Sequence, residues 1–321
     1  MKIIISEFID ASAVESLASH FEVHADATLV DRPDALRSLL DDADALIVRN
    51  RTQVTPALLD DAPRLIAVGR LGVGLDNIDL AACAQRGVQV FPATGANARA
   101  VAEYVIATAL MLLRRAYLSS ASVAAGEWPR AALSSGRELA GSTMAVIGFG
   151  AIGQLVARLA RALDMRVVGY DPQQPASAAC WSETGAQCVT FEHALRTADV
   201  VSVHVPLIDA TRNLLDADRL SMLKPHAAVI NTSRGGVIDE TALAEALRQG
   251  RLGGAALDVF ADEPLKAASP LAGAPNLILT PHIAGLTVQS NERVSTLVAA
   301  RVKQALLDHR RHSQQSEKIS T

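Results

Sequence analysis

Short apolar runs alternate with segments of helical periodicity in the first third of the chain. Continuous apolar runs are typical of parallel strands buried on both faces of a sheet. We therefore predict four strands, at Lys2–Ser6, Ala45–Arg49, Leu65–Gly69 and Val88–Phe91. Helical spacing occurs between these runs, at Ala11–Ser19, Pro33–Leu40 and Pro56–Leu59. This alternation predicts a parallel sheet with helices on both faces.

A longer segment rich in Ala, Leu and Val follows, and we predict one helix from Ala98 to Ala125 that ends at Gly126–Pro129. Because this segment is apolar nearly all round, we expect it to be buried at a domain or subunit interface. A second alternation of strands and helices begins near Met144. The strands predicted there are Met144–Ile147, Arg166–Tyr170, Val200–Val205, Ala228–Asn231, Ala255–Val259 and Leu277–Thr280, with helices at Ile152–Leu163 and Glu240–Arg248.

The last helical pattern, Val288–Leu307, is amphipathic, and we expect it to cross back and cover the first sheet. The polar tail His309–Thr321 is expected to fray. The chain of 321 residues suggests two domains, and the shared strand–helix style of its halves suggests two similar ones.

A glycine-rich turn joins the predicted strand Met144–Ile147 to the next helix. Gly148, Gly150 and Gly153 have G-x-G-x-x-G spacing, and Ala151 and Ile152 open the helix. Such a turn brings backbone N–H groups and the positive end of a helix dipole close to a pyrophosphate. Asp171 closes the following strand, where its carboxylate would bind a ribose diol and repel a 2′-phosphate. The segment predicts a dinucleotide site and favours NAD over NADP.

Composition excludes several other classes of function. The formal net charge of −4 gives no sign of nucleic-acid binding, and no apolar run reaches the length of a membrane span. The three cysteines, Cys83, Cys180 and Cys188, have neither metal-binding nor redox spacing, so no metal site is predicted. With no export signal, this cysteine usage predicts a cytoplasmic protein.

Three polar residues follow three predicted strands at the sheet edge where ligands bind in open α/β folds. They are Arg234, Glu263 and His282. An arginine binds a carboxylate at two points, a histidine exchanges a proton with a hydroxyl or carbonyl, and a carboxylate fixes the histidine tautomer. Taken singly, each has an ordinary structural explanation as a surface charge, a turn residue or a packed histidine. Spacing alone leaves both interpretations open.

Several segments resemble the D-isomer-specific 2-hydroxyacid dehydrogenase family, in the order that the family has them. These are Gly69–Asp79, Gly95–Tyr104, Val146–Gly153, His204–Leu207, Asn231–Glu240, Ala256–Pro264 and Pro281–Gly285. The resemblance implies that Arg234, Glu263 and His282 are catalytic, and none of the three departs from the family pattern.

The resemblance also implies an architecture of two Rossmann-like, doubly wound parallel-sheet α/β domains. Residues 1–96 with 287–321 would form a discontinuous substrate-binding domain, and 97–286 the NAD-binding domain. The active site would lie in the cleft between them. A homodimer through the cofactor domain is implied, with the apolar helix Ala98–Ala125 at its interface.

The family pattern further implies which residues contact the ligands. The backbone of Val73 and Gly74 would bind the substrate carboxylate together with Arg234. Besides the glycine turn and Asp171, the implied cofactor contacts are Val101, His204, Val205, Pro206, Thr211, Thr232, Ser233, Asp258, His282 and Gly285. Asp258 is expected at the nicotinamide end. His204, taken by itself, is more typical of a structural histidine.

The substrate is a 2-hydroxy or 2-oxo acid on this interpretation, and two arginines bear on its second substituent. Arg49 and Arg51 follow a predicted strand, where they would bind a second anionic group, unless one or both are solvated surface charges. Arg130 is a further candidate contact. Family members acting on sulfolactate resemble this chain in these segments, so 3-sulfolactate is favoured. 3-Phosphoglycerate comes next, although the extra regulatory domain of many such enzymes is missing here.

Two alternatives stay open at this point. One is reduction of glyoxylate or hydroxypyruvate, which needs no second anion site. The other belongs to a different class, because transcriptional corepressors resemble this family and use the fold as an NAD-sensing, protein-binding module.

Overall fold

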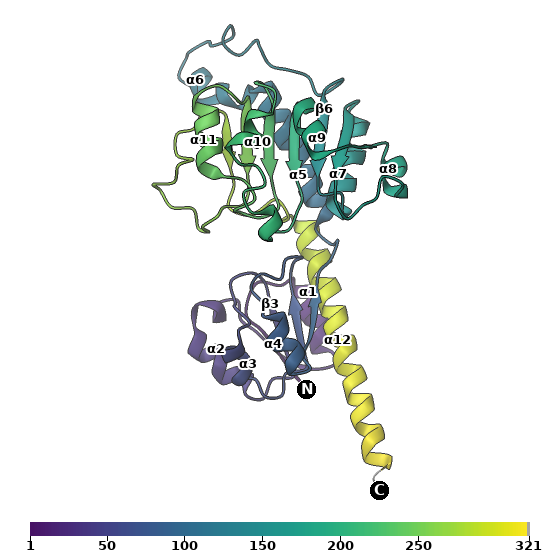
Figure 1. Cartoon of the computed structure of the whole chain (residues 1–321). Coiled ribbons are helices and arrows are strands. Elements are labelled where there is room, and N and C mark those ends of the chain that lie inside the picture. Colours follow the sequence, from purple (N-terminus) through teal and green to yellow (C-terminus); the bar gives the residue numbers. More distant parts are fainter. Residues whose placement is uncertain (320–321) are drawn as a thin grey trace. The chain divides into compact units, whose positions relative to one another are not determined.

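The computed structural model describes residues 1–319, which form two compact units. One unit contains Met1–Asn97 and the chain from Leu286 onward, and the other is Ala98–Gly285. Each unit has its own parallel sheet with helices packed on both faces (Figure 1). The predicted α/β fold class is confirmed.

The sheet of the first unit has the strand order β2-β1-β3-β4-β5, and all neighbours are parallel. Its strands are β1 (Lys2–Ile5), β2 (Glu22–Ala25), β3 (Ala45–Val48), β4 (Ala67–Arg70) and β5 (Gln89–Pro92). One face is covered by α2 (Pro33–Leu40), α3 (Pro56–Asp60) and α4 (Leu80–Gln85), with η1 (Leu29–Asp31) beside them. The other face is covered by α1 (Ala11–Ala18) and α12 (Val288–Ile319).

Helix α12 explains why the end of the chain belongs to the first unit. Val294, Val298, Val302 and Leu306 recur every four residues and are buried against the sheet. The contact is close at Gly69 of β4, where an added Cβ would lie 2.6 Å from Val298 Cγ1. The predicted crossing of this helix onto the first sheet is therefore what the structure has.

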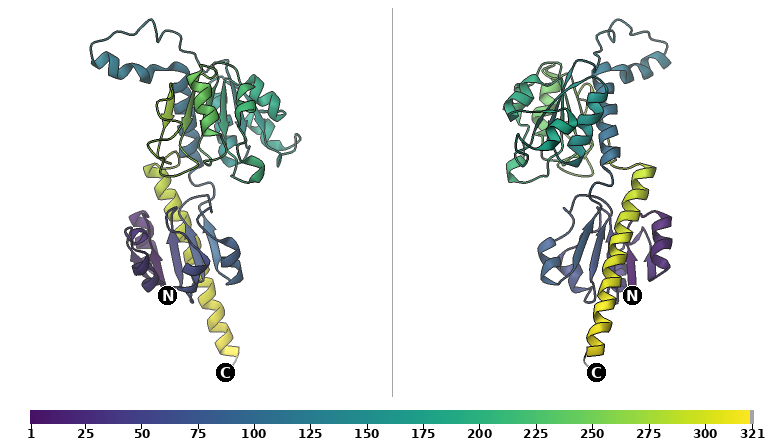
Figure 2. Two further views of the ribbon diagram at one scale, coloured as in Figure 1. Left: turned by 60° about the vertical axis from the view of Figure 1, so that its left-hand side comes forward. Right: turned by 90° about the vertical axis from the view of Figure 1, so that its right-hand side faces the viewer.

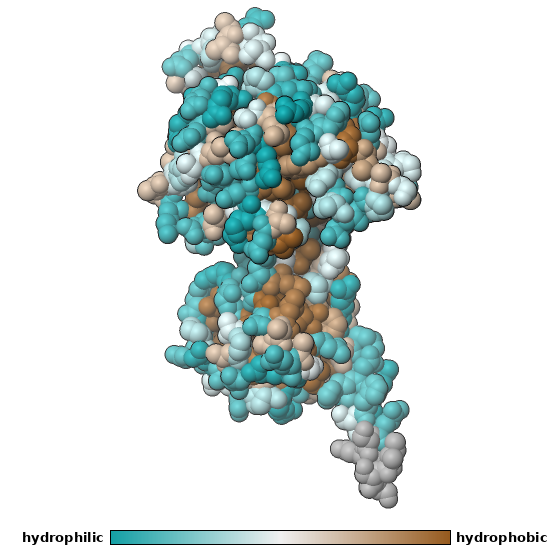
Figure 3. Space-filling model, in the orientation of Figure 1, coloured by the Kyte–Doolittle hydropathy of each residue, from teal (hydrophilic) through white to brown (hydrophobic). Residues whose placement is uncertain are grey.

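The predicted end of that helix is wrong, because α12 continues to Ile319 instead of fraying after Leu307 (Figure 2). The apolar stripe stops near Leu306, and the part of the helix beyond it that Figure 3 draws in colour is hydrophilic on the face shown. Local side-chain pairs at helical spacing support it there, including Gln304 with Asp308 and Arg311 with Asp308. A prediction that relies on the periodicity of apolar residues cannot identify a helix that lacks them.

The second unit is a doubly wound sheet of order β12-β11-β10-β9-β6-β7-β8, and all neighbours are parallel. The strand order reverses between β6 and β9, and this reversal creates the crevice in which open α/β sheets bind ligands. The strands are β6 (Thr143–Ile147), β7 (Arg166–Tyr170), β8 (Gln187–Cys188), β9 (Val200–Val203), β10 (Ala228–Asn231), β11 (Gly254–Leu257) and β12 (Leu277–Leu279).

Helices cover both faces of this sheet over separate aliphatic cores. One core lies beneath α9 (Phe191–Thr197), α10 (Ala217–Ser221) and α11 (Glu240–Arg248). The other lies beneath α5 (Ala98–Arg114), α7 (Ala151–Ala162) and α8 (Ala179–Thr184). The short η3 (Asp209–Thr211) follows β9. The elements β2, β8, α4, α8, α9 and α10 were not predicted, because they are short and β2 and β8 lie at sheet edges.

The prediction of one helix from Ala98 to Ala125 is wrong. Helix α5 ends at Arg114, Arg115 has a left-handed φ of 56°, and η2 (Ala116–Ser119) and α6 (Ser120–Ala124) follow. The returning chain sets this end, since the Arg137 N–H binds the carbonyl oxygen of Leu113. Helix propensity continues past this point, so the break depends on a segment more than twenty residues away. Figure 2 shows α6 and the loop after it projecting from the unit.

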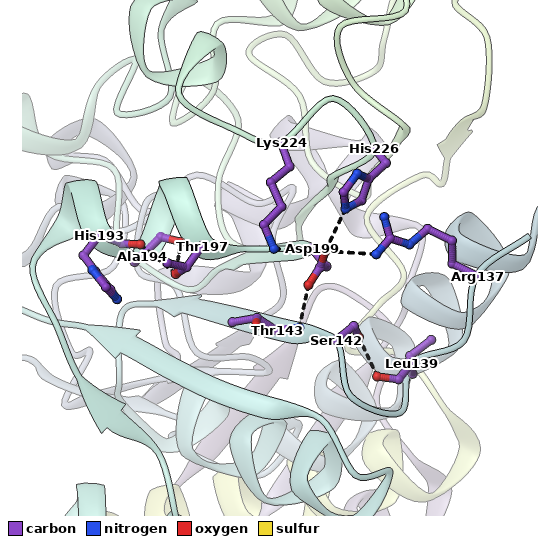
Figure 4. A network of polar contacts seen from close by, with 10 residues as sticks. All are labelled: Arg137, Leu139, Ser142, Thr143, His193, Ala194, Thr197, Asp199, Lys224 and His226. Carbon is purple, nitrogen blue, oxygen red and sulfur yellow. Dashed lines mark hydrogen bonds and ion pairs between the residues drawn. The ribbon is translucent and has the colours of Figure 1, made fainter.

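Asp199, which precedes β9, ties together the amino ends of several strands (Figure 4). Its side chain is 5% exposed, and Oδ2 accepts the Thr143 N–H at 2.8 Å. Oδ1 accepts hydrogen bonds from His226 at 2.8 Å, Lys224 at 3.1 Å and Arg137 at 3.3 Å. Burial raises the pKa of Asp199, but the hydrogen bonds from His226, Thr143 and Lys224 outweigh it and the pKa is lowered. Within residues 1–319, no helix is both long and apolar enough to cross a membrane.

We predict that Asp199→Asn lowers the free energy of unfolding of this unit by about 2–3 kcal/mol at neutral pH. The pKa of Asp199 lies below its ordinary 3.8 in the folded state, so its stabilisation is complete above that value. It is lost as the pH falls through the folded pKa, and the difference between wild type and variant should shrink below about pH 4. Urea unfolding followed by the fluorescence of buried Trp181 measures this, with Glu245→Gln on α11 as the control. Equal stabilities at neutral pH would contradict the prediction.

Candidate functional site

The glycine turn between β6 and α7 packs directly against the end of β9. Gly148 has a φ of +91°, and a Cβ added there would lie 2.5 Å from the carbonyl oxygen of His204. A Cβ on Gly153 would lie 2.2 Å from the Gly148 carbonyl oxygen. Both positions require glycine, because backbone atoms fill the space that any side chain would need.

The outer side of the same turn is open. A Cβ on Gly150 would meet nothing within 4 Å, although Gly150 is the N-cap of α7 and has no side-chain capping bond. The first N–H groups of a helix have no partner inside the helix, and α7 begins with Ala151 and Ile152. An open glycine face above free N–H groups fits a phosphate.

Asp171, immediately after β7, is held in place by hydrogen bonds to the backbone, one of them from the glycine turn. Its Oδ2 accepts the Phe149 N–H at 2.7 Å, and Oδ1 accepts the Gln173 N–H at 2.8 Å. Each oxygen keeps a lone pair for a further donor, as a ribose diol would supply. The carboxylate therefore lies beside the phosphate-binding turn with its orientation already set.

Two further predicted cofactor residues follow β9 and β10. Burial lowers the pKa of His204 to about 4, so the ring is neutral at physiological pH, and Nε2 lies 2.8 Å from Ser202 Oγ. Thr232 Oγ1 is buried without a hydrogen-bond partner among the described residues. A buried hydroxyl without a partner destabilises the fold, and a bound ligand would satisfy it.

The other predicted cofactor residues lie in the same unit. Val101 is buried in α5, and Val205 and Pro206 follow β9. Ile208 N–H binds Thr211 Oγ1 at 2.9 Å, which closes the loop after Pro206. Ser233 is bonded through its N–H and hydroxyl to Asn231 Oδ1, and Gly285 ends the unit.

The three predicted catalytic residues lie in loops that follow the adjacent strands β10, β11 and β12. Glu263 Oε2 and His282 Nδ1 are 2.9 Å apart, so the structure pairs the predicted carboxylate with the predicted histidine. Glu263 Oε1 also accepts the Phe260 N–H at 3.1 Å, which fixes the carboxylate. His282 Nε2 makes no hydrogen bond to any described residue and is available to a substrate. Arg234 donates from Nη1 to the Ser233 carbonyl oxygen at 2.6 Å.

The loops carrying Arg234 and Glu263 are in backbone contact. A Cβ on Gly235 would lie 1.8 Å from the Phe260 carbonyl oxygen. Asn231 Nδ2 donates to the Arg234 carbonyl oxygen at 2.9 Å, and Glu240 Oε1 accepts the Ala261 N–H at 2.7 Å. Sequence reasoning missed the supporting roles of Asn231 and Glu240, since only the folded loops bring these atoms together.

Asp258 supports the histidine loop. It is 1% exposed, and it accepts the N–H groups of Ile283 and Ala284, each at 2.8 Å. Thr280 Oγ1 donates to Asp258 at 2.6 Å and lies 2.6 Å from the hydroxyl of Tyr104. The Asp258 carboxylate thus holds the loop in which the backbone of His282 is left-handed, with a φ of 55°. Its expected contact with nicotinamide stays a prediction.

In the first unit, a buried glutamate fixes the loop after β3. Glu7 is 6% exposed, and its carboxylate accepts the N–H groups of Arg49 at 2.8 Å, Thr52 at 3.0 Å, Arg51 at 3.1 Å and Asn50 at 3.3 Å. Burial by itself raises the pKa of Glu7, but the hydrogen bonds from Thr52, Arg49 and Arg51 together have the larger effect. The pKa therefore lies below its ordinary value, and the group is ionised at neutral pH. Nothing in the sequence pairs Glu7 with a loop forty residues away.

Arg49 and Arg51, both predicted substrate residues, have different surroundings. Arg49 is half-buried, donates from Nη2 to Asn291 Oδ1 at 2.8 Å, and has its guanidinium carbon 5.7 Å from the centre of the Phe8 ring. Arg51 is exposed and forms a two-point ion pair with Asp31.

The remaining predicted contacts are all accessible. The N–H groups of Val73 and Gly74 bond to no described residue, so they are available to a carboxylate. Val73 is exposed and Gly74 is partly buried. Arg130 is exposed in the loop after α6.

Comparisons with known proteins bear on these sites. The sequence model of the D-isomer specific 2-hydroxyacid dehydrogenase NAD-binding domain matches residues 106–284. The (S)-sulfolactate dehydrogenase of Chromohalobacter salexigens is 51% identical over 95% of this chain and 98% of its own length. The D-3-phosphoglycerate dehydrogenase of Mycobacterium leprae is 39% identical, and the match covers 56% of it. Among solved structures, D-lactate dehydrogenase from Aquifex aeolicus with NAD and lactic acid has a TM-score of 0.82 at 29% identity, covering 96% of each chain.

We predict that Asp171→Ala changes the choice between NADH and NADPH. Removing the carboxylate deletes hydrogen bonds to the ribose of NADH and the repulsion of a 2′-phosphate, so the affinity ratio should shift toward NADPH by roughly tenfold or more. Fluorescence titrations with both cofactors measure the ratio, and Glu245→Ala, which removes a charge from α11, is the control. An unchanged ratio would contradict the ribose role. If both affinities fell equally, Asp171 would act only by holding the glycine turn in place.

Proposed function

The chain belongs to the D-isomer-specific 2-hydroxyacid dehydrogenase family, and from that premise we propose that it interconverts (S)-3-sulfolactate and 3-sulfopyruvate. It is an NAD-dependent oxidoreductase that acts at C2 of a 2-hydroxy or 2-oxo acid. The observation that carries the proposed mechanism is the Glu263–His282 pair, 2.9 Å apart at the strand ends of the NAD-binding unit.

In this mechanism His282 is the acid and base. On oxidation, Nε2 accepts the proton of the C2 hydroxyl while a hydride leaves C2. On reduction, Nε2 gives a proton to the carbonyl oxygen as C2 receives a hydride. Glu263 accepts a hydrogen bond from Nδ1–H, which fixes the tautomer in which Nε2 is the free base, and the carboxylate balances the charge of the ring once Nε2 is protonated. NAD, when bound, supplies the hydride acceptor.

The substrate carboxylate is proposed to bind Arg234 and the N–H groups of Val73 and Gly74. A guanidinium fork matches a carboxylate at two points, and the two N–H groups have no other partner in residues 1–319. These groups belong to different units, so the proposal needs the active site to lie in a cleft between the units. That location stays a prediction.

Arg49 is proposed to bind the sulfonate. Its guanidinium is held by Asn291 and Phe8, whereas the fork of Arg51 is occupied by Asp31. The identity of 51% across nearly the whole length of a sulfolactate dehydrogenase supports this substrate. 3-Phosphoglycerate is the second candidate, because relatives named as phosphoglycerate dehydrogenases are 36–40% identical over 93–95% of this chain. Glyoxylate or hydroxypyruvate, which has no second anion, is the third.

A homodimer through the NAD-binding unit is part of the proposal. Helix α6 buries none of its residues, and Trp128 in the following loop is 78% exposed. Leu110 and Met111 of α5 are also exposed. An exposed segment with apolar side chains, such as α6 and the loop that follows it, is typical of a surface that a second copy of the chain covers. A cytoplasmic location also stays a prediction.

We predict that His282→Ala lowers kcat by roughly 10²–10⁴-fold while NADH still binds, because the general acid is lost and the glycine turn is intact. Steady-state reduction of 3-sulfopyruvate and a separate NADH fluorescence titration measure the two effects. His309→Ala, an exposed histidine on α12, is the matched control. Near-normal turnover by the His282 variant would contradict the acid–base role.

We predict that Arg49→Ala raises KM for 3-sulfopyruvate roughly 10-fold or more and raises KM for glyoxylate much less, since only the larger acid has a second anion. Arg51→Ala is the matched control from the same loop, and its effect should be small because Asp31 already engages that side chain. Measuring both variants with both acids separates the outcomes. Equal effects of Arg49→Ala on the two acids would remove the second-anion assignment.

A further inference from the structure

Two adjoining pockets lie at the amino edge of the sheet in the second unit. Their volumes are about 540 and 490 Å³, and they share Arg166 and Lys224, so they form one groove. Thr143 and Arg166, the first residues of β6 and β7, line it, and so does Asp199 in front of β9. The glycine turn follows the carboxyl end of β6, so the groove lies at the opposite edge of the sheet. We call it the amino-edge groove, and no predicted site residue lines it.

The amino-edge groove is positively charged in a protein that is negative as a whole. Its lining contains five cations, Arg137, Arg161, Arg166, Arg196 and Lys224. The carboxylates in the lining are two, Glu138 and Asp199, which leaves an excess of three positive charges with the histidines neutral. The whole chain has a net charge of −4. A concave site lined by one sign of charge concentrates ions of the other sign.

Part of this charge is held in place before any ligand binds. Figure 4 shows the side chains of Arg137, Lys224 and His226 converging on the buried carboxylate of Asp199. One negative charge thus orients two permanent cations and a histidine. An ammonium has three donors and a guanidinium five, so Lys224 and Arg137 keep N–H groups for a further acceptor.

Arg166 and Arg196 are the cations of the groove without partners. Both are exposed, and neither guanidinium makes a hydrogen bond or ion pair with any residue in the described part of the chain. Arg166 lines both pockets, while Arg196 lines the smaller one, which has no carboxylate in its lining. Their charge is therefore available to an anion.

Compensation of helix dipoles explains only part of the cluster. Arg161 and Arg196 lie in the last turns of α7 and α9, where a cation offsets the negative end of the helix. Arg166 begins a strand, and Arg137 and Lys224 lie in loops. Arg137 and Lys224 neutralise Asp199 instead, which leaves Arg166 with neither a helix end nor a carboxylate to offset.

We propose that the amino-edge groove binds a compact polyanion, a small molecule with two or more phosphate or carboxylate groups. Phe, Tyr and Trp side chains are missing from its lining in residues 1–319, so the groove offers a ligand mainly positive charge and no large aromatic surface. Arginine forks match phosphate and carboxylate oxygens in pairs. The site is separate from the cofactor and substrate, and the proposal stands whichever 2-hydroxy acid the enzyme uses.

Inorganic pyrophosphate is the probe for this site, in isothermal titration calorimetry at about 0.15 M ionic strength. Saturating NADH is present so that the glycine turn is occupied and cannot bind the probe. The variant is Arg166→Ala with Arg196→Ala, two changes at exposed side chains that break no hydrogen bond or ion pair among the described residues. The control is Arg158→Ala, an exposed arginine of α7 outside the groove, and circular dichroism verifies that each variant is folded.

We expect wild type and the Arg158→Ala control to bind pyrophosphate with the same sub-millimolar Kd, and the double variant to bind at least about tenfold more weakly. The double variant should keep normal KM for the 2-oxo acid, because neither residue lies at the active site. Three results would overturn the proposal. They are no binding to wild type up to about 5 mM probe, equal binding by the double variant, or binding seen only when NADH is left out.

Discussion

Carboxylates that accept backbone N–H groups, three of them buried, hold several of the predicted functional loops of this protein. Glu7 accepts four such groups from the Arg49 loop, Asp258 accepts two from the His282 loop, and Asp171 accepts the Phe149 N–H of the glycine turn. Asp199 does the same for the start of β6. A charged acceptor forms stronger hydrogen bonds than a neutral one, and breaking them leaves a buried charge unpaired. Each loop is therefore fixed at one conformation before ligands arrive.

The parallel sheet gives the two edges of the NAD-binding unit different chemistry. Its carboxyl ends bring together the glycine turn, Asp171 and the Glu263–His282 pair, because all strands run the same way. Its amino ends collect Asp199 and a surplus of arginine and lysine. Helix dipoles favour anions at the first edge and cations at the second. Arg166 at the second edge is neither at a helix end nor paired with a carboxylate of the described residues, so dipole compensation does not explain it.

The confirmed predictions are those that depend on local pattern. The apolar runs identified most of the strands, and the cofactor predicted from the glycine spacing and Asp171, NAD, is confirmed. The wrong predictions concern where helices end. Helix α5 stops at Arg114 because a returning segment caps Leu113, and α12 continues past Leu307 without an apolar stripe. Periodicity indicates burial, so it does not predict a helix end set by a distant hydrogen bond or a helix that continues beyond its apolar stripe.

The sequence by itself determined the fold class, the cofactor and the residue types that the chemistry needs, since these depend on periodicity and short motifs. Only the tertiary structure decided which side chains meet. It paired Glu263 with His282, turned Asp258 toward the histidine loop, and separated Arg49 from Arg51 by giving them different partners. It also placed Glu7 under a loop forty residues away. Such contacts join atoms distant along the chain, and only the packing of the sheet and its helices brings them within hydrogen-bonding distance.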